Sequence, residues 1–467
     1  MISTLLMCAL QTQTVSLSLD KTSEPWQGWG TSLCWMGKVF GQREDLADAL
    51  FTTKEVQIGS AVIPGLGMNI VRYNAGACSW NVVGGRRMVT SKIILPYRQM
   101  EAFWLDPTKP APESDGWDWN TDLNQVEMMR KAKRRGADKF ELFSNSPVWW
   151  MCKNDNPSGA LKASDDNLRE ECYDDFAIYL AEVARHSKEK WGISFTTIDP
   201  FNEPLSDWWD ADCKQEGCHF SVEAQCRLLP LLRTELDKRN LKSLPIAASD
   251  ETYVTHAITA WKGYDAIAKS LVKQVNVHGY QGLISPRAKL RQTVGNLPIW
   301  LSEHGENDTT GLILVGSILK DIHDLQPVAW SYWQPLDGSN WGLIDAEMTI
   351  GKLNEVTPKY FALAQFSRHI RKGMRIIPSS DPTIVFAHDS RSKKLVVVVA
   401  NLTKTAKTKT ISFADFKTVG TKIDTWITEP KRGVLYQKGA KPVLEAKMMT
   451  INLPSESVQT IELRAGN

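Results

Sequence analysis

Two glutamates stand at matching places behind short apolar runs of the chain. Glu203 follows residues 195–201 and Glu303 follows residues 298–301, each with one residue between, and a proline or a His304-Gly305 pair comes next. Runs of this length are typical of buried strands. Cleaving the acetal between two sugars needs one carboxyl that protonates the leaving oxygen and another that attacks or stabilises the oxocarbenium-like centre. The pair therefore predicts a retaining glycosidase.

Short apolar runs alternate with helix-like segments and predict the frame that brings these glutamates together. The strand candidates are residues 29–35, 68–73, 139–144, 195–201, 245–249, 274–278, 298–301 and 328–333. The helix candidates are residues 44–51, 122–135, 167–191, 222–239, 253–272, 286–294, 311–325 and 358–370. This alternation predicts an α/β fold with a (β/α)8 TIM barrel. An open doubly wound sheet fits less well, because no glycine-rich dinucleotide loop follows the first strand.

After residue 371 the pattern changes to alternating β-branched and polar residues, which predicts a C-terminal antiparallel β-sandwich. Its strand candidates are residues 383–388, 394–401, 409–413, 422–428, 448–453 and 458–463. Residues 14–19 alternate in the same way, so we expect this N-terminal strand to join the sandwich. The expected division is a possible leader at 1–13, the N-terminal strand segment at 14–28, the catalytic barrel at 29–371 and the sandwich at 372–467.

The composition points to a globular protein without a charged-polymer partner. The chain has 467 residues with 55 Lys and Arg against 53 Asp and Glu, and these charges are not gathered into blocks of one sign. We therefore expect no nucleic-acid or membrane partner, and we expect a monomer. No HExxH motif or paired histidine spacing occurs, so a metal-assisted hydrolase is disfavoured and we expect neither a metal nor a cofactor.

Several features bear on the compartment. Residues 1–10 are apolar but lack a basic n-region, so they form a weak leader, with an imprecise gene start as the alternative. The acceptor patterns at Asn307 and Asn401 fit an exported protein, and we expect secretion. The eight cysteines show no paired CxxC, which favours disulfides over zinc. Cys213 and Cys218 flank a short loop, and we favour a bridge between them over free thiols.

The neighbours of the two glutamates suggest their roles. Barrel residues at the carboxyl ends of strands face the mouth, and Glu203 and Glu303 end the fourth and seventh strands. Asn202 can bind a sugar hydroxyl beside the scissile carbon, which makes Glu203 the acid/base candidate. Arg72, at the end of the second strand, would keep Glu303 ionised as the nucleophile. The alternatives are ordinary surface carboxylates for the glutamates and a structural salt bridge for Arg72.

Other polar and aromatic residues at strand ends are candidates for substrate binding. Tyr280 could donate to the nucleophile, and His278 could contact a sugar hydroxyl or be a core histidine. Trp333 could form a floor under a sugar ring, with core packing as the alternative. Trp35, Trp149 and Asn340 are further candidates. The tryptophan content, 18 residues, is unusual, and those near the motifs are Trp35, Trp149, Trp150, Trp208, Trp209, Trp333 and Trp341.

Longer stretches of the chain resemble glycoside hydrolase family 30, and within it the fungal endo-β-1,6-galactanases. They include GWGTSL from Gly28, IPGLGMNIVRYNAGAC from Ile63, ELFSNSPVWWM from Glu141, FNEP from Phe201, EGCHF from Glu216, NVHGYQG from Asn276, SEHG from Ser302, WSYWQPLDGSNWGL from Trp330 and KYFALAQFSRHIR from Lys359. The resemblance implies that Glu203 is the acid/base, that Glu303 is the nucleophile and that a barrel is paired with a sandwich. It also implies hydrolysis of β-1,6-galactan side chains of arabinogalactan proteins with retention.

The sequence departs from the family pattern after the nucleophile, where His304 stands in place of an expected tyrosine. Related members act as β-1,6-glucanases, xylanases or glucosylceramidases with the same two carboxyls, so these activities remain alternatives. A catalytically silent carbohydrate-binding relative is the alternative from another class, although both glutamates are present.

Overall fold

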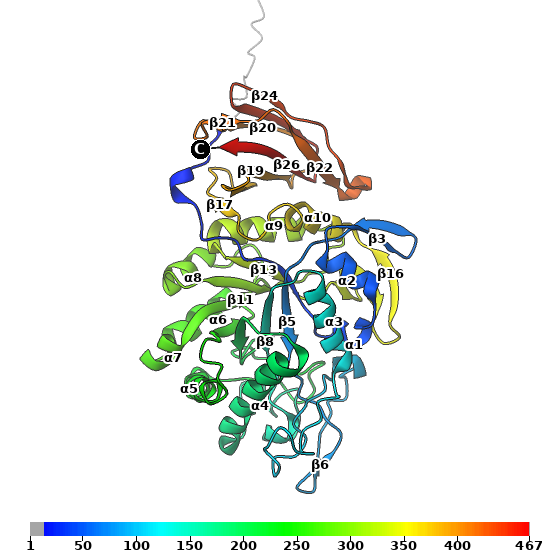
Figure 1. Cartoon of the computed structure of the whole chain (residues 1–467), viewed down its shortest axis with the longest axis vertical. Helices are drawn as coiled ribbons and strands as arrows, with labels where there is room; N and C mark the ends of the chain where they lie inside the picture. The colour runs from blue at the N-terminus through cyan, green and yellow to red at the C-terminus, as the bar shows by residue number, and fades with distance from the viewer. Residues whose placement is uncertain (1–13, 467) are drawn as a thin grey trace, which may run out of the picture.

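A computed structural model describes residues 14–466, and its main feature is a closed barrel of parallel strands (Figure 1). In chain order the barrel strands are β2 (Gly28–Ser32), β5 (Ile70–Asn74), β8 (Lys139–Phe143), β9 (Thr197–Asp199), β10 (Ile246–Glu251), β11 (Val272–His278), β12 (Ile299–Glu303) and β13 (Ala329–Tyr332). Each strand pairs with its neighbour in the chain, and β13 closes on β2. The predicted barrel is confirmed, and each predicted strand overlaps an observed one.

Helices alternate with these strands as predicted. They are α1 (Met36–Phe40), α2 (Glu44–Phe51), α3 (Leu123–Arg134), α4 (Tyr173–His186), α5 (Val222–Lys238), α6 (Val254–Gly263), α7 (Ala266–Leu271), α8 (Arg287–Val294), α9 (Leu312–Lys320) and α10 (Pro358–Ser367). The segment expected as one helix over 253–272 is split into α6 and α7. The split occurs because the side chain of Asp265 accepts a hydrogen bond from the Ala268 amide and begins a new helix.

Three small β-sheets lie outside the barrel in the part of the chain that the structure describes. Two short hairpins pair β3 (Glu55–Ile58) with β4 (Ala61–Pro64) and β6 (Val82–Val83) with β7 (Arg86–Arg87). A small sheet of β14 (Leu336–Asp337), β15 (Ile344–Glu347) and β16 (Lys352–Val356) follows β13. This sheet lies next to the mouth of the barrel, and its loops contribute to the cleft described below.

The C-terminal part consists of two sheets packed face to face around apolar side chains, as predicted. One sheet contains β17 (Arg375–Ile377), β18 (Ile384–Asp389), β19 (Lys394–Asn401), β26 (Ser457–Gly466), β22 (Asp424–Glu429), β23 (Val434–Lys438) and β21 (Thr418–Val419). The other contains β1 (Thr14–Val15), β20 (Lys407–Ser412), β25 (Met448–Leu453) and β24 (Val443–Glu445). β1 pairs with β20, so the N-terminal strand does join the sandwich, although it is shorter than expected. The expected leader at 1–13 lies outside the described residues, and we propose 371 as the boundary between the two parts.

Helix α10 lies between the barrel and the sandwich (Figure 1). Its residues from Lys359 to Ser367 are all buried. Gln365 donates to Thr428 of β22 at 2.9 Å and its carbonyl accepts from Thr460 of β26 at 2.7 Å. Just past the helix, Arg368 donates to the hydroxyl of Tyr436 at 2.8 Å. Polar contacts therefore fix the sandwich on the helical layer of the barrel.

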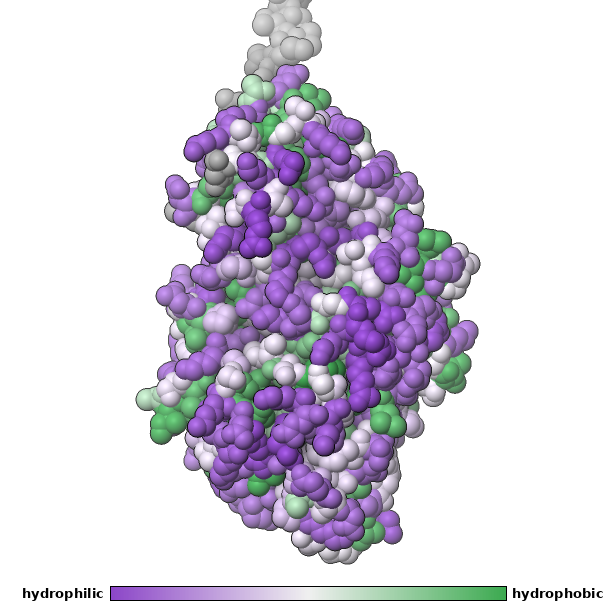
Figure 2. All heavy atoms as spheres, in the orientation of Figure 1, coloured by the Kyte–Doolittle hydropathy of each residue, from purple (hydrophilic) through white to green (hydrophobic). Residues whose placement is uncertain are grey.

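The surface and the cysteines bear on the expected partners and compartment. Polar and charged side chains cover most of the face in Figure 2, and apolar ones are scattered in small groups. Among residues 14–466 no helix combines the length and the apolar character needed to cross a bilayer. The predicted Cys213–Cys218 bridge is wrong, because both are free thiols. Cys218 is buried and donates to the carbonyl of His219, whereas Cys213 faces the open cleft.

Candidate active site

A cleft of 1180 Å³ opens at the carboxyl ends of the barrel strands, and both predicted glutamates line it. The loops after β2, β9, β10, β11, β12 and β13 all contribute to its lining. In TIM barrels this face carries the chemistry, because the strand ends converge there while the loops vary freely. Residues that follow strands on opposite sides of the barrel, such as Trp35 after β2 and Thr252 after β10, therefore line the same cleft.

Glu303 is the last residue of β12 and is held by two donors and a nearby imidazole. Tyr280 donates its hydroxyl to Oε1 at 2.9 Å, and Arg72 donates from Nη1 to Oε2 at 3.1 Å. The imidazole Nδ1 of His278 lies 3.5 Å from Oε1. Donors on both oxygens stabilise the ionised form of this carboxyl, as a nucleophile requires.

Glu203 lies on a strained turn beyond β9. Its φ of 51° is in the left-handed region, which non-glycine residues rarely adopt. The turn is held because its amide donates to the Asp250 carbonyl at 2.8 Å and its carbonyl accepts from Nε1 of Trp209 at 2.9 Å. Thr252 and His278 both donate to Oε1, the latter at 3.1 Å. Oε2 is therefore the oxygen left to carry a proton towards a substrate.

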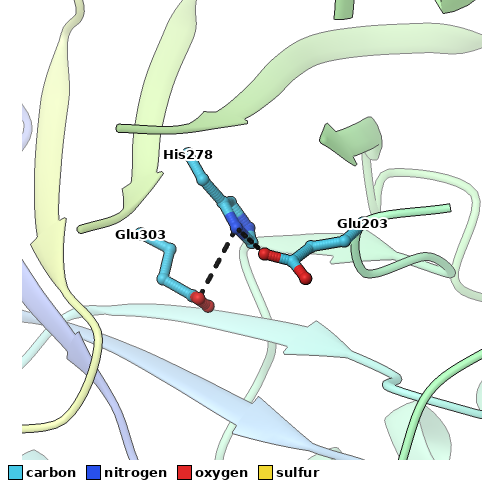
Figure 3. Close-up of side chains that lie close together, drawn as sticks. All are labelled: Glu203, His278 and Glu303. Atoms are coloured by element: carbon cyan, nitrogen blue, oxygen red, sulfur yellow. Dashed lines mark hydrogen bonds and ion pairs between the residues drawn. The ribbon is translucent and has the colours of Figure 1, made fainter. Parts of the chain in front are cut away.

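The two carboxyls converge on His278 (Figure 3). Ligand atoms of Glu203, His278 and Glu303 all lie within 4.8 Å of one another. Retaining glycosidases have carboxyls about 5–5.5 Å apart, whereas inverting ones leave about 6.5–9.5 Å for a water molecule. The separation falls on the retaining side of this division and fits direct attack by one carboxyl.

A buried charge network lies beneath the pair. Arg72 is fully buried and donates from Nε to Glu141 at 2.9 Å, from Nη1 to Glu303 and from Nη2 to Asp250. His278 Nε2 lies 3.1 Å from Asp250 Oδ1. One arginine and one histidine thus connect the candidate catalytic carboxyls to two buried acids in the barrel interior, and they fix the orientation of Glu303.

The network shifts several pKa values. Burial raises the pKa of Glu303 to about 7, while the charges of His278 and Arg72 act in the opposite direction. Burial alone would lower the pKa of His278, but Glu303 and Asp250 outweigh it and raise that pKa well above its usual value. Burial would raise the pKa of Asp250, but Arg72 and His278 lower it to about 2. These shifts favour an imidazolium at His278 beside the Asp250 carboxylate.

The structure brings four of the eight predicted substrate-binding residues to the cleft lining. Asn202, Tyr280, Trp35 and Trp333 line it, and the two tryptophan rings meet edge to face at 5.2 Å. The side-chain oxygen of Asn202 is buried and accepts no hydrogen bond from the described residues, so it is free to bind a sugar hydroxyl. Arg72 and His278 lie behind this lining and reach the cleft only through the glutamates.

Two predicted positions lie elsewhere. Trp149 is fully buried, and its indole donates to Ser79 at 2.7 Å, so it is a core residue that does not line the cleft. Trp150 is likewise buried away from the lining. Asn340 is exposed on a loop whose neighbours Ser339 and Trp341 do line the cleft. Its carbonyl accepts from the ammonium of Lys359 at 2.9 Å, which anchors that loop.

Some residues that contact the pair were missed from the sequence. Asp250 and Thr252 lie at the end of β10 and just beyond it, where the rule for strand ends would also have found them. Glu141, which pairs with Arg72, is a charged residue between the apolar residues Phe140 and Leu142 of β8, which is itself a signal of a buried ion pair. Trp209 had been noted only as an aromatic residue near a motif, and its contact with the Glu203 carbonyl had no sequence signal.

Glu203, His278 and Glu303 are also a group whose ligand atoms are close enough to surround an ion. A metal-binding histidine must offer a lone pair from a neutral ring. The raised pKa of His278 and its contacts with Asp250 and Glu203 favour the protonated ring, which has no lone pair for an ion. The chemistry of this set therefore favours proton transfer and covalent catalysis over metal binding.

Comparisons with known proteins agree with this geometry. The model of O-glycosyl hydrolase family 30 matches residues 12–257. An endo-beta-1,6-galactanase from Hypocrea rufa is 42% identical over 456 residues, covering 96% of this chain and 94% of that protein. An exo-beta-1,6-galactobiohydrolase from Bifidobacterium longum subsp. longum is 22% identical, and the match covers 72% of this chain but 29% of that protein.

A solved structure shares the fold. The catalytic domain of GH30 xylanase C from Talaromyces cellulolyticus superposes with a TM-score of 0.72 at 18% identity, covering 97% of this chain and 100% of that one. A family model that spans more than half of the chain, together with a relative of 42% identity along nearly its whole length, shows that the protein belongs to glycoside hydrolase family 30.

Proposed function

We propose that the protein is an endo-acting glycosidase that hydrolyses β-1,6-galactosidic linkages with retention of configuration. The observation that carries the proposal is the approach of Glu203 and Glu303 to within 4.8 Å in a large open cleft. The choice of linkage and sugar is supported by the relative named endo-beta-1,6-galactanase. The substrates we propose are the β-1,6-galactan side chains of arabinogalactan proteins.

The contacts of each carboxyl support its proposed role. Glu303, paired with Arg72 and Tyr280, attacks the anomeric carbon while Glu203 passes its proton to the glycosidic oxygen, and the C–O bond to the leaving sugar breaks. In the second step Glu203 takes a proton from water as the water oxygen attacks the glycosyl ester. This step releases the sugar, regenerates the Glu303 carboxylate and leaves Glu203 protonated.

We propose that the other cleft residues position the sugar. Asn202 would bind the hydroxyl beside the anomeric carbon, where the hydrogen bond strengthens as charge develops. Trp333 and Trp35 present flat apolar area to a sugar ring. His278 would keep the carboxyl of Glu203 in position. Asn340 does not line the cleft, so its neighbours in the exposed loop, rather than its own side chain, would contact the substrate.

We also propose that the protein is secreted, because its proposed polymeric substrate occurs outside cells. We propose that it binds no nucleic acid, because its charges nearly balance, and that it is a monomer. One acceptor pattern supports export better than the other. Asn307 is exposed, whereas the amide nitrogen of Asn401 donates to the carbonyls of Thr405 and Pro454 at 2.7 and 2.8 Å. A glycan on Asn401 would replace one of the two amide hydrogens and so break at least one of these hydrogen bonds.

The test is to incubate the protein in parallel with β-1,6-galactan, β-1,6-glucan and glucuronoxylan and to follow the anomeric proton of the first product by NMR. We expect β-galactosyl products from galactan, and Glu303→Gln should lower kcat by at least roughly 10³-fold while keeping the fold. Cleavage of glucan or xylan in preference to galactan would refute the linkage, and a first product of α configuration would refute retention.

A further inference from the structure

Glu216 is a fully buried carboxyl in the loop between β9 and α5. Within residues 14–466 it forms no ion pair, and its partners are polar groups of other loops. Oε1 accepts from the amides of Ala77 at 3.2 Å and Met100 at 3.1 Å and from the Cys78 thiol at 3.1 Å. Oε2 lies 3.3 Å from the amide nitrogen of Asn74, which donates to it.

These four donors come from segments that surround the cleft. Asn74 ends β5, and Ala77 and Cys78 belong to the loop that follows it. Met100 lies two residues after Arg98, which lines the cleft and stacks on Trp35 at 4.3 Å. One carboxyl thus joins the loop after β9 to the loop after β5 and to the segment that carries Arg98.

The residues on either side of Glu216 in the chain lie at the cleft or against a residue that lines it. The residues just before it, Cys213, Lys214 and Gln215, line the cleft. The residue just after it is Gly217, where a Cβ atom would lie 2.0 Å from the ring of Trp209. Trp209 itself lines the cleft and donates to the Glu203 carbonyl. Residues 213–215 thus form one wall of the cleft, and the buried side chain of Glu216 anchors the end of this segment in the protein interior.

We propose that Glu216 is a positioning residue that fixes the spacing between the cleft wall formed by residues 213–215 and the segment carrying Arg98, and so sets the affinity for a polysaccharide chain. The inference rests on the proposed function, because it assumes that several sugar units lie along the cleft. Bond cleavage itself depends on Glu203 and Glu303, which have their own contacts to Thr252, His278, Tyr280 and Arg72.

Removal of Glu216 should alter this spacing because a buried hydrogen-bond donor without an acceptor is unfavourable in free energy. Removing the carboxyl leaves the Ala77 and Met100 amides unpaired in the protein interior, and such groups are stable only if water or another acceptor reaches them. The segments would separate to admit water. The wall would then lose its spacing from Arg98, while the two glutamates would keep their separation.

The test compares Glu216→Ala and Glu216→Gln with the wild-type protein on two substrates. One is polymeric β-1,6-galactan, and the other is an aryl β-galactoside that fills only the sugar position at the catalytic pair. We expect the KM for the polymer to rise by at least about 10-fold in the alanine variant and by less in the glutamine variant, which keeps one acceptor oxygen. The kcat for the polymer and the kcat/KM for the aryl substrate should stay within about threefold of wild type.

Hydrogen exchange gives a second readout that needs no substrate. In both variants the amides of Ala77 and Met100 and the peptide covering 213–217 should exchange faster than in the wild type. The matched control is Glu182→Gln, because Glu182 is also buried but pairs with Arg185 and Arg239 on the outer helices. It should lower the melting temperature without changing KM or the exchange of these peptides.

Two results would overturn the inference. One is an unchanged KM for the polymer despite a loss of stability like that of the control, which would make Glu216 purely structural. The other is an equal loss of kcat/KM on the aryl substrate, which would place its effect on the chemistry. If the wild type cleaves another polymer in place of galactan, the proposed function fails, and the same comparison on that polymer still decides the role of Glu216.

Discussion

The hydroxyl of Tyr280 offers a direct test of how Glu303 is kept ionised. Tyr280→Phe deletes the donor that lies 2.9 Å from Oε1 of Glu303 and leaves the ring in place. The ring has its own neighbours, since it lies parallel to His304 and close to Trp341. We therefore expect the variant to fold normally and to change only the environment of the carboxylate.

The expected size follows from the strength of a hydrogen bond to a charged group, about 1.5–3 kcal/mol. At about 1.4 kcal/mol per pKa unit, losing this donor should raise the pKa of Glu303 by about 1–2 units, because the bond favours the ionised form. The wild-type pKa is already raised to about 7 by burial. Because the nucleophile must be ionised, the acid limb of kcat/KM should move to higher pH by the same amount, and the rate below pH 7 should fall about 10- to 100-fold.

The assay is kcat/KM on the cleaved galactan across the pH range for the wild type, Tyr280→Phe and a control. Tyr264→Phe is a suitable control, because its buried hydroxyl donates to Gln225 on α5 at 2.6 Å, away from the cleft. The control profile should overlay that of the wild type. An acid limb that stays in place in Tyr280→Phe would show that this hydroxyl does not hold the ionised nucleophile.

Two further predictions concern stability. Arg72→Gln leaves Glu141 and Asp250 without their buried cation, so the free energy of unfolding in urea should fall by about 3–5 kcal/mol; a fall below about 1 kcal/mol would contradict the charge network. Glu216 has a pKa raised by burial from 4.5 to about 7, so the folded state holds its proton more tightly and stability is lost as pH rises from about 4.5 through about 7. Urea titrations at pH 4 and pH 8 measure how much the free energy of unfolding changes between these pH values, and Glu216→Gln should reduce this change by about 3 kcal/mol. An equal change in the wild type and the variant would refute the raised pKa of Glu216.

The barrel and the convergence of Glu203 and Glu303 could be predicted from the sequence because each strand leaves a local apolar signature. The strand ends then follow from the general geometry of parallel barrels. Even the N-terminal strand was recognisable, since its alternation matched that of the sandwich. Contacts that depend on side-chain packing across the barrel, such as Arg72 with Asp250, carry no such signature.

The expectations for Trp149 and for a Cys213–Cys218 bridge were wrong for the same reason. Trp149 follows a strand end, but the chain turns it into the core, where its indole finds Ser79. Cys213 and Cys218 are close in sequence, but one lies in the cleft and the other in the interior. In both cases the direction of the side chain is decided by the packing of the loop, which spacing in the sequence does not encode.

Helix α10 makes the two parts of the enzyme a single physical unit. It is the last helix around the barrel, yet its buried length from Lys359 to Ser367 also serves as the base on which the sandwich rests. A shortened form that stops after this helix would expose apolar side chains to solvent. It would also leave the side-chain amide of Gln365 without its acceptor Thr428. We therefore expect the barrel to need the β-sheet module in order to fold, and removal of the module to yield aggregated protein.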